Sequence, residues 1–301
     1  MAEVSIIIPS YGRPTYLDRA IRSVISQTFS DWELIIVDDN NPDTDPRKET
    51  EKLMLNYSAY NNIKYLKHDK NKNGAAARNT GINIATGKYI TFLDDDDEYL
   101  PERLEKCVAM LNQKENCTYG GVYTGCEFRR NGKTYYNHVD VKSGNYIVDT
   151  LKCTFMLCSG SNLFIRADIV RELGGFDESF LRHQDYEFLV RFFRKYDLIA
   201  IPEILMIKNQ LNANTPNAER MYKIKQHYWD KFQTDIEKLE PEVQKQVYFM
   251  GYLQLIEYAA KDGNTKVKKQ YIQKSKKYGT IPVNNWVRIW AHSIIALFKG
   301  K

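Results

Sequence analysis

The chain has 301 residues, 43% of them apolar and 27% charged, the proportions of an ordinary globular protein. Its net charge of +5 is too small to indicate nucleic-acid binding, and no apolar segment reaches the roughly 20 residues that span a bilayer. The five cysteines are odd in number and lack paired metal spacing, which favours reduced thiols over a disulfide framework. Because the first residues also lack the basic region and cleavage site of a signal peptide, the sequence predicts a cytoplasmic protein.

Basic residues are concentrated near the C-terminus. Residues 219–301 contain 16 lysines and arginines against 8 acidic residues, which leaves 27 basic and 30 acidic residues in 1–218. This asymmetry predicts two parts, 1–218 and 219–301, with different partners.

In the first part, short apolar runs alternate with helical patterns. The runs are typical of buried parallel strands and lie at Val4–Ile8, Leu34–Val37, Ile63–Lys67 and Tyr89–Leu93. Helical spacing of apolar or alanine residues extends over Pro14–Gln27, about 46–60 and Gly74–Ala85. The alternation predicts an α/β fold with a mostly parallel, Rossmann-like sheet flanked by helices.

After Asn112 the pattern is less regular. Strands are predicted at Tyr119–Thr124, Ser161–Ile165 and Leu198–Ile201, with a hairpin over Glu127–Tyr136. Helices are predicted at Arg166–Leu173 and Asp185–Tyr196, the first ended by Gly174-Gly175. The second part is predicted to be a helical extension, with helices at Met221–Lys231, Pro241–Ala260, Lys266–Lys276 and Val283–Phe298.

Four consecutive aspartates, Asp94–Asp97, directly follow the fourth predicted strand. Acidic runs are usually solvated loops, and that alternative stays open for the run alone. Adjacent carboxylates repel one another, however, and a bound Mg²⁺ or Mn²⁺ compensates because these ions prefer oxygen ligands. A predicted helix led by Pro101 follows, so the run lies at the carboxyl end of a strand, where α/β sheets bind ligands. This context favours a metal–nucleotide site.

Three strand ends are predicted to meet at one edge of the sheet. They carry Pro9-Ser10-Tyr11-Gly12-Arg13, Asp38-Asp39 and Asp94–Asp97. Each segment alone could be a turn or a solvated strand end. Together they indicate a ligand site, because such sites are assembled from these loops.

At this point the chain resembles the family 2 glycosyltransferases, which have the A-type nucleotide-sugar fold. The resemblance covers roughly residues 3–210. It depends on five motifs in order, at 4–11, 26–29, 33–39, 74–79 and 92–97.

The resemblance implies a nucleotide site in which Asp39 binds the base, usually uracil. Asp96 is the implied ligand of a divalent metal, Mn²⁺ or Mg²⁺, on the diphosphate. The nucleotide-binding residues carried over are Pro9, Tyr11, Arg13, Asp39, Arg78, Asp94 and Asp95.

The family also implies a catalytic base at the start of a late helix, and Asp185 matches that position in Gln184-Asp185. Its alternative role is a helix N-cap, which aspartate favours. Gly160, Ser161, His183 and Gln184 are predicted to line the donor and acceptor pocket.

Two departures from the family pattern are visible. Many relatives have a histidine after the last strand that completes the metal shell, and 207–212 contains none. The Gln-x-x-Arg-Trp motif of processive synthases is also absent, which predicts transfer of a single sugar.

The predicted function is therefore an inverting, metal-dependent glycosyltransferase using a nucleotide sugar, most simply a UDP-sugar, with a glycan or lipid-linked acceptor. The alternatives are a nucleotidyltransferase, which should have a Gly-rich basic phosphate loop, and a non-catalytic nucleotide-binding relative. A phospho-acceptor receiver module also clusters aspartates but needs only about 120 residues.

The last predicted helix carries an apolar surface and a basic one. The apolar surface consists of Trp286, Ile289, Trp290, Ile294, Leu297 and Phe298. Arg288, His292 and Lys299 lie along another side. This pattern suits a peripheral helix on the inner face of an anionic membrane. The alternative is packing against the protein itself or against a second subunit of a homo-oligomer.

Overall fold

The computed structural model describes residues 2–210 and 216–299, with side chains described up to residue 296. It contains two compact units. The first comprises Met1–Asn145 and Met156–Asn212, and the second Tyr146–Phe155 and Ala213–Lys301. The predicted boundary after residue 218 stays a prediction. The second unit also includes an earlier segment, Tyr146–Phe155, which interrupts the first unit in sequence.

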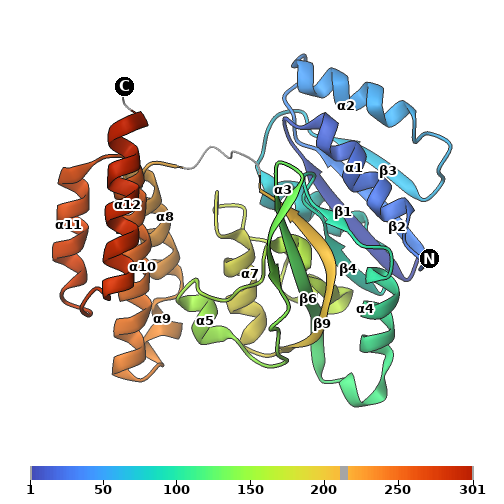
Figure 1. Ribbon diagram of the computed structural model, residues 1–301. Helices are drawn as coiled ribbons and strands as arrows, with labels where there is room; N and C mark the ends of the chain where they lie inside the picture. The colour runs from blue at the N-terminus through green and yellow to red at the C-terminus, as the bar shows by residue number, and fades with distance from the viewer. Residues whose placement is uncertain (1, 211–215, 300–301) are drawn as a thin grey trace. The chain divides into compact units, whose positions relative to one another are not determined.

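The first unit contains a nine-stranded sheet flanked by helices (Figure 1). Its strands are β1 Val4–Ser10, β2 Trp32–Asp38, β3 Ile63–Lys67, β4 Tyr89–Phe92, β5 Glu98–Tyr99, β6 Tyr119–Arg130, β7 Lys133–His138, β8 Phe164–Arg166 and β9 Asp197–Asn209. Its helices are α1 Pro14–Ile25, α2 Asp45–Leu55, α3 Gly74–Ile84, α4 Arg103–Asn112, α6 Ala167–Glu172 and α7 Gln184–Phe193, with 3-10 turns at Lys114–Asn116 and Gly160–Asn162.

The strand order is β3-β2-β1-β4-β8-β6-β9-β5, with β7 paired to β6. The four strands predicted first, β1 to β4, are all parallel. Strand β8 runs antiparallel between β4 and β6, and β9 is parallel to β6. The predicted α/β class, a sheet of Rossmann type flanked by helices, is confirmed.

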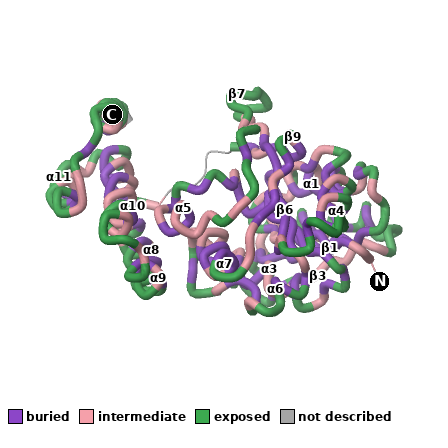
Figure 2. The backbone as a smooth tube through the Cα atoms, turned by 90° about the horizontal axis from the view of Figure 1, so that it is seen from below, coloured by how far each residue is buried: buried purple, intermediate pink, exposed green. Residues whose placement is uncertain are grey.

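Helices cover both faces of the parallel strands, which explains their continuous apolar sequences. Successive side chains of a strand point to opposite faces. Ile6 and Ile8 belong to the same core cluster as Leu17 and Leu104, from α1 and α4. The intervening Ile7 faces α3 instead, so close that a Cβ on Gly81 would lie 2.5 Å from Ile7 Cγ2. Buried backbone accordingly gathers along β1 and β6 (Figure 2).

The register brings the predicted strand ends together. Ser10 pairs with Asp38 across β1 and β2, and Ile7 pairs with Phe92 across β1 and β4. Asp39 continues this alignment because its backbone N–H donates to the Ser10 carbonyl at 2.8 Å. The acidic run therefore begins two residues beyond Phe92 at the same edge as the loops after β1 and β2.

Several predicted elements differ from the structure in their extent. Strand β9 continues from Asp197 to Asn209, well past the predicted Ile201, because its second half pairs with β6 and β5. Helix α4 begins at Arg103, after a turn at Pro101 and Glu102, so Pro101 does not lead it. Ser161 belongs to a 3-10 turn before β8 rather than to the strand.

The second unit is built around one long helix. Its helices are α5 Ile147–Leu151, α8 Ala218–Lys231, α9 Gln233–Glu237, α10 Pro241–Lys261, α11 Thr265–Ser275 and α12 Val283–Lys299. Helix α10 packs against each of the others in this unit. Gly251 makes room for the Trp229 ring, since a Cβ there would lie 2.3 Å from Cζ2. Among the described residues, no helix is both long and apolar enough to cross a membrane.

Helix α12 corrects one part of the predicted apolar surface. Ile289 is buried against the unit, whereas Trp286 and Trp290 are 43% and 68% exposed. The exposed side also includes the apolar residues Val283, Val287 and Ile295. The side chains of Leu297, Phe298 and Lys299 lie outside the described residues.

Candidate active site

A cavity of about 570 Å³ opens at the carboxyl edge of β1, β2 and β4. It is lined by residues from five loops and from the first turns of α3 and α7. The lining residues are Pro9, Ser10, Tyr11, Arg13, Asp39, Asn71, Asn73, Gly74, Ala77, Arg78, Asp94, Leu181, Arg182 and Gln184. Seven predicted site residues are therefore brought to one cavity, across a sequence separation of more than 170 residues.

Asp39 anchors the loop that forms one wall of this cavity. Its carboxylate accepts hydrogen bonds from the backbone N–H groups of Lys72 and Asn73 and from the Asn71 amide, at 2.7, 2.9 and 2.8 Å. His68 Nδ1 lies 2.7 Å from the same carboxylate. Asn73 in turn caps α3 by accepting from Ala75 N–H. Asp39 thus both faces the cavity and fixes the entry of α3.

Arg78 links three segments at the opposite wall. Its guanidinium donates to Gln184 Oε1 at 2.9 Å and to Asp94 Oδ1 at 2.6 Å. Helix α3, the start of α7 and the end of β4 are joined in this way. The charge-assisted hydrogen bond from Arg78 holds Asp94 at the cavity surface.

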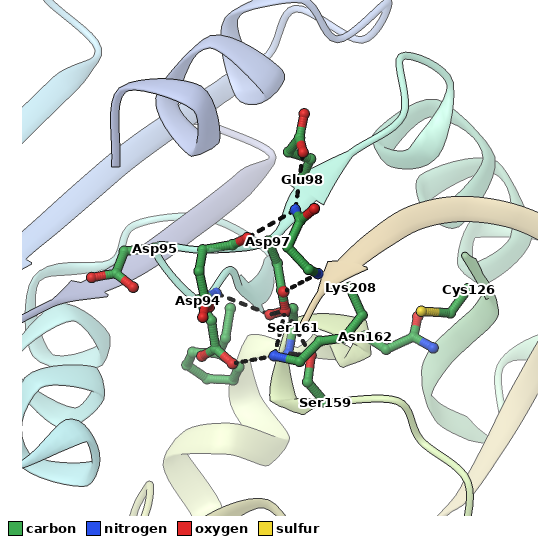
Figure 3. A network of polar contacts seen from close by, with 12 residues as sticks. Asp94, Asp95, Asp97, Glu98, Cys126, Ser159, Ser161, Asn162 and Lys208 are labelled. Atoms are coloured by element: carbon green, nitrogen blue, oxygen red, sulfur yellow. Dashed lines mark hydrogen bonds and ion pairs between the residues drawn. The ribbon is translucent and has the colours of Figure 1, made fainter. Parts of the chain in front are cut away.

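Asp94, Asp95 and Asp97 point in different directions (Figure 3), and the four aspartates do not all share one partner. Asp94 faces Arg78, whereas Asp95 and Asp96 both pair with Arg13. Asp97 is fully buried and accepts from the Ser159 and Ser161 hydroxyls at 2.9 and 2.7 Å. The acidic run is therefore an ordered, ion-paired segment beside the cavity and is not a solvated loop.

Burial and neighbouring cations set the ionisation of these carboxyls. Burial raises the pKa of Asp94, but Arg78, Lys208 and Arg13 outweigh it and hold that pKa at about 2. Burial raises the pKa of Asp95 to about 7 despite Arg13, and that of Asp97 to about 6 despite Lys208. Of these three carboxyls, Asp94 is thus the one that stays ionised across the physiological range.

The donor set of this cluster fits a hard divalent cation. Asp94, Asp96 and Asp97 each offer an oxygen, and these oxygens lie within 4.8 Å of one another. Asp94 and Asp96 are the more suitable pair because the oxygens of Asp97 already accept hydrogen bonds. Asp95 is buried and does not line the cavity, so its predicted role in nucleotide binding stays a prediction.

Asp185 lies beside the cavity in the first turn of α7. A Cβ built on Gly160 would lie 3.9 Å from Asp185 Cβ and 4.0 Å from Arg78 Nη2, so the three residues are neighbours. The N-cap of α7 is His183, in a left-handed conformation, and not Asp185, so the alternative role as a cap is wrong. Burial raises the pKa of Asp185, as a proton acceptor near neutral pH requires.

The small residues before β8 support the aspartates from behind. The Ser161 hydroxyl lies 2.9 Å from the Asp94 backbone N–H, which donates to it, and itself donates to Asp97. Gly160 lies directly beside Asp185, so that a Cβ built on it would be at the distance of an ordinary van der Waals contact. Neither Ser161 nor His183 lines the cavity, so their predicted pocket contacts stay predictions.

Several cavity residues were not predicted from the sequence. Asn71, Asn73, Leu181 and Arg182 lie in loops without a strand-end motif. Asn73 had a detectable signal, because an asparagine before an alanine-rich helix is a preferred N-cap. Lys208, which contacts the aspartates, had only the signal of a lone charge in an apolar strand end.

Comparison with known proteins identifies the family of this chain. The family model described as glycosyl transferase family 2 matches residues 5–174, more than half of the chain. An uncharacterised glycosyltransferase of Rickettsia prowazekii is 32% identical over 214 residues, 70% of this chain and 64% of its own length. A second one, from Rickettsia conorii, has the same identity, but this chain spans only 34% of its length.

A relative with a stated activity is the GalNAc(5)-diNAcBac-PP-undecaprenol beta-1,3-glucosyltransferase of Campylobacter jejuni. It is 35% identical over 134 residues, which are 44% of this chain and 40% of that protein.

Solved structures share the fold at low sequence identity. Residues 1–349 of S. aureus TarS, in complex with UDP-GlcNAc, align with a TM-score of 0.60 and 15% identity over 92% of this chain and 90% of that chain. A mannosyltransferase from Pyrobaculum calidifontis, in complex with GDP-Man and Mn²⁺, aligns with a TM-score of 0.59 and 16% identity over 99% and 86%.

Proposed function

Because the chain belongs to glycosyltransferase family 2, we propose that it moves a single sugar, with inversion, from a nucleotide sugar to a hydroxyl acceptor. The observation that carries the proposal is the convergence of Asp39, Arg78, Asp94 and Gln184 on one cavity, with Asp185 beside it. The cavity supplies the nucleotide site, and Asp185 supplies the proton acceptor.

The donor is proposed to be a UDP-sugar. Tyr11 is 54% exposed at the cavity wall, where its ring can stack on a base, and Asp39 lies on the same wall. The structural neighbours contain UDP-GlcNAc in one case and GDP-Man in the other. Guanine nucleotides are therefore the comparison that the experiment must include.

Asp96, together with Asp94, is proposed to hold Mn²⁺ or Mg²⁺. When bound there, such an ion stabilises the negative charge that develops on the departing diphosphate. Arg78 and Arg13 keep these carboxylates in place, since both arginines pair with them in the structure.

Asp185 is proposed to take the proton from the acceptor hydroxyl. It lies beside Gly160 and Arg78, and Arg78 pairs with Asp94, which lines the cavity. The N-terminus of α7 favours the ionised form, whereas burial favours the neutral one. The balance leaves a carboxylate whose pKa is raised toward the working pH, as a general base needs.

The geometry speaks against a nucleotidyltransferase. Such an enzyme needs a basic loop after β1 that is available to phosphates. Arg13, the basic residue of this loop, is instead held by Asp95 and Asp96.

We propose that the acceptor is a lipid-linked or surface glycan and that α12 brings the protein to the membrane. The name of the Campylobacter relative describes an undecaprenol-linked substrate. On α12 the apolar residues Val283, Trp286, Val287 and Trp290 share the exposed side, which is unusual for a helix in water. Arg288 on the same helix is also exposed, and the surrounding part of the chain is basic. Two tryptophans beside basic residues suit an anionic bilayer surface better than a second copy of this basic unit.

The test of the proposed reaction begins with nucleotide binding. Calorimetric titration of UDP with Mn²⁺ should show binding that EDTA removes, and Asp96→Ala should weaken it by about tenfold or more. Glu102→Ala, which removes an exposed carboxylate of the same unit, should bind like the wild type. No binding of UDP or GDP in the presence of metal would contradict the proposal, and binding of GDP alone would change the donor.

The membrane contact is tested with vesicles. We expect the full chain to sediment with vesicles that contain anionic lipid, more weakly at high salt, and the Trp286→Ser/Trp290→Ser double variant to stay in solution. Leu55→Ser, at an exposed leucine of α2, is the matched control and should sediment like the wild type. If the double variant sediments with the vesicles as the wild type does, the membrane proposal is wrong. If light scattering shows a wild-type dimer and a monomeric double variant, the surface is a dimer interface instead.

A further inference from the structure

Lys208 places a positive charge inside the aspartate cluster. Its Nζ lies 3.1 Å from Asp97 Oδ2 and 3.6 Å from Asp94 Oδ2 (Figure 3). These are two of the three residues whose oxygens are grouped closely enough to hold a metal ion. The ammonium group therefore contacts two of these three carboxylates, one of them Asp94, which is proposed to hold the metal.

The fold brings Lys208 there from a distant part of the sequence. Strand β9 runs antiparallel to β5, and Ile207 pairs with Glu98 directly after the aspartates. Asn209 reinforces the alignment because its backbone N–H donates to Asp97 Oδ1 and its amide donates to the Asp96 carbonyl. Lys208, between these two residues, is held against the cluster by backbone pairing.

The cations around the cluster nearly balance its charge. Four carboxyl groups face Arg13, Arg78 and Lys208, each within ion-pair distance. A site with three resident cations attracts a divalent ion far less than four unpaired carboxylates would. Lys208 is the cation that contacts the grouped oxygens of both Asp94 and Asp97.

A purely structural role for Lys208 explains only half of its contacts. Asp97 is buried and already accepts from Ser159, Ser161 and the Asn209 N–H, so it does not depend on Lys208 alone. The lysine also reaches Asp94, which lines the cavity and is paired with Arg78. Its side chain is 23% exposed, so it can leave the aspartates for another anion.

We propose that Lys208 competes with the divalent cation for the Asp94 carboxylate, so that the free protein binds metal weakly and takes it up together with the donor diphosphate. The second half of this statement rests on the proposed function. A diphosphate adds negative charge and oxygen ligands for the metal, and it offers the Lys208 ammonium a new partner. The lysine then passes from the carboxylates to the phosphate oxygens, and the oxygens of Asp94 become available.

The test uses Mn²⁺ alone, measured as free ion by electron paramagnetic resonance, with no nucleotide present. Lys208→Met removes the charge and keeps the length of the side chain. We expect it to bind Mn²⁺ about tenfold more tightly than the wild type, because repulsion of the ion is lost. Lys208→Arg should bind like the wild type, since the charge remains. Lys106→Met, which removes a lysine paired with Glu102 and Glu203 away from the cluster, is the matched control and should also be unchanged.

The direction of the change separates this proposal from structural damage. A disturbed site binds metal more weakly, so only competition predicts a gain. A second neutral variant, Lys208→Gln, is measured in parallel, and circular dichroism checks that both variants are folded. If both folded variants bind Mn²⁺ no more tightly than the wild type, the proposal is overturned.

A second titration, with UDP present, separates the two proposals. UDP should tighten Mn²⁺ binding in the wild type by a larger factor than in Lys208→Met, because the variant has no lysine to displace. If UDP changes neither protein, the donor assignment fails, while the comparison without nucleotide still decides the role of Lys208.

Discussion

At the scale of single residues, the site is defined by which carboxyl groups are paired and which are not. Arg13, Arg78 and Lys208 hold all four consecutive aspartates in ion pairs. Asp185 differs because the structure gives it no ion pair among the described contacts that are shorter than 4 Å. Its carboxylate accepts from the Tyr186 N–H at 3.0 Å. That difference supports the proposal that Asp185 is the proton acceptor.

We expect Asp185→Asn to lower the turnover of a nucleotide-sugar donor by about 10² to 10⁴, because the amide cannot accept the proton. Nucleotide affinity should be nearly unchanged, since Asp185 does not line the cavity. The assay is release of the nucleotide, with calorimetry for binding. Glu178→Gln, an exposed change in the preceding loop, is the control.

The pH dependence follows from the same residue. Burial raises the pKa of Asp185 above its ordinary value of 3.8, and the base acts only when ionised. The wild-type rate should therefore fall as the pH drops through this raised pKa, at a pH higher than an exposed aspartate would give. Full activity of Asp185→Asn, or a rate that rises on acidification, would exclude Asp185 as the base.

At the scale of elements, the parallel strands are tied together below the site by Glu33. This buried carboxylate at the start of β2 accepts from Ser5 Oγ on β1 at 2.6 Å and from Lys64 Nζ on β3 at 2.7 Å. It also accepts from the Thr86 N–H, before β4, at 2.6 Å. One side chain thus joins four consecutive strands at the end opposite the cavity.

Burial alone would raise the pKa of Glu33, but the hydrogen bonds from Lys64, Ser5 and Thr86 lower it to about 2 from 4.5. We expect Glu33→Gln to lower the free energy of unfolding at pH 7 by about 2 kcal/mol, less than the whole pKa shift implies because Lys64 is partly exposed.

The sign of the pH effect is fixed by the depressed pKa. The stabilisation is complete above pH 4.5 and disappears as the pH falls toward 2, so the two proteins should converge in acid. Urea unfolding at pH 7 and pH 3 measures this. Glu51→Gln, which breaks an exposed pair with Lys67, should change neither value measurably. A constant difference between wild type and Glu33→Gln at both pH values would contradict the assignment.

At the scale of the whole molecule, the second unit is assembled from two separate stretches of chain. Tyr228 on α8 is buried, and its hydroxyl donates to the Thr150 carbonyl in α5 at 2.9 Å. Gln254 on α10 donates to the Cys153 carbonyl at 3.1 Å. The excursion of residues 146–155 is therefore part of the helical unit, although the sheet continues on either side of it in sequence.

We expect Tyr228→Phe to destabilise this unit by about 0.5 to 1.5 kcal/mol, because a buried hydrogen bond is lost while the Thr150 carbonyl keeps the Cys153 N–H. Hydrogen exchange should accelerate together in 147–151 and in α8, while the amides of β1 stay protected. Tyr60→Phe, at an exposed tyrosine, is the control. Equal acceleration in β1 would show that the two units unfold as one.

Local patterns in the sequence were sufficient for the first half of the sheet and for the position of the site. Continuous apolar runs predicted β1, β2, β3 and β4, because a strand buried on both faces must be apolar throughout. Asp39 and Asp94 could be placed at one edge because the carboxyl ends of parallel strands meet there. Asp185 was found only through the family motifs. It lies far from Asp94 in sequence, and no periodic pattern of residues predicts that the two come close together.

Only the tertiary structure decided which partners these groups have. Strand β8 inserts between β4 and β6, and β9 returns to β5, through backbone pairing between segments far apart in the chain. That pairing brings Lys208 to Asp97 and leaves Arg13 with Asp95 and Asp96. Periodicity records which side of an element is buried, but an ion pair depends on what packs against it. The sequence alone therefore determined the fold class and the edge of the sheet at which the cavity lies. The charge balance of the aspartate cluster was decided by long-range packing.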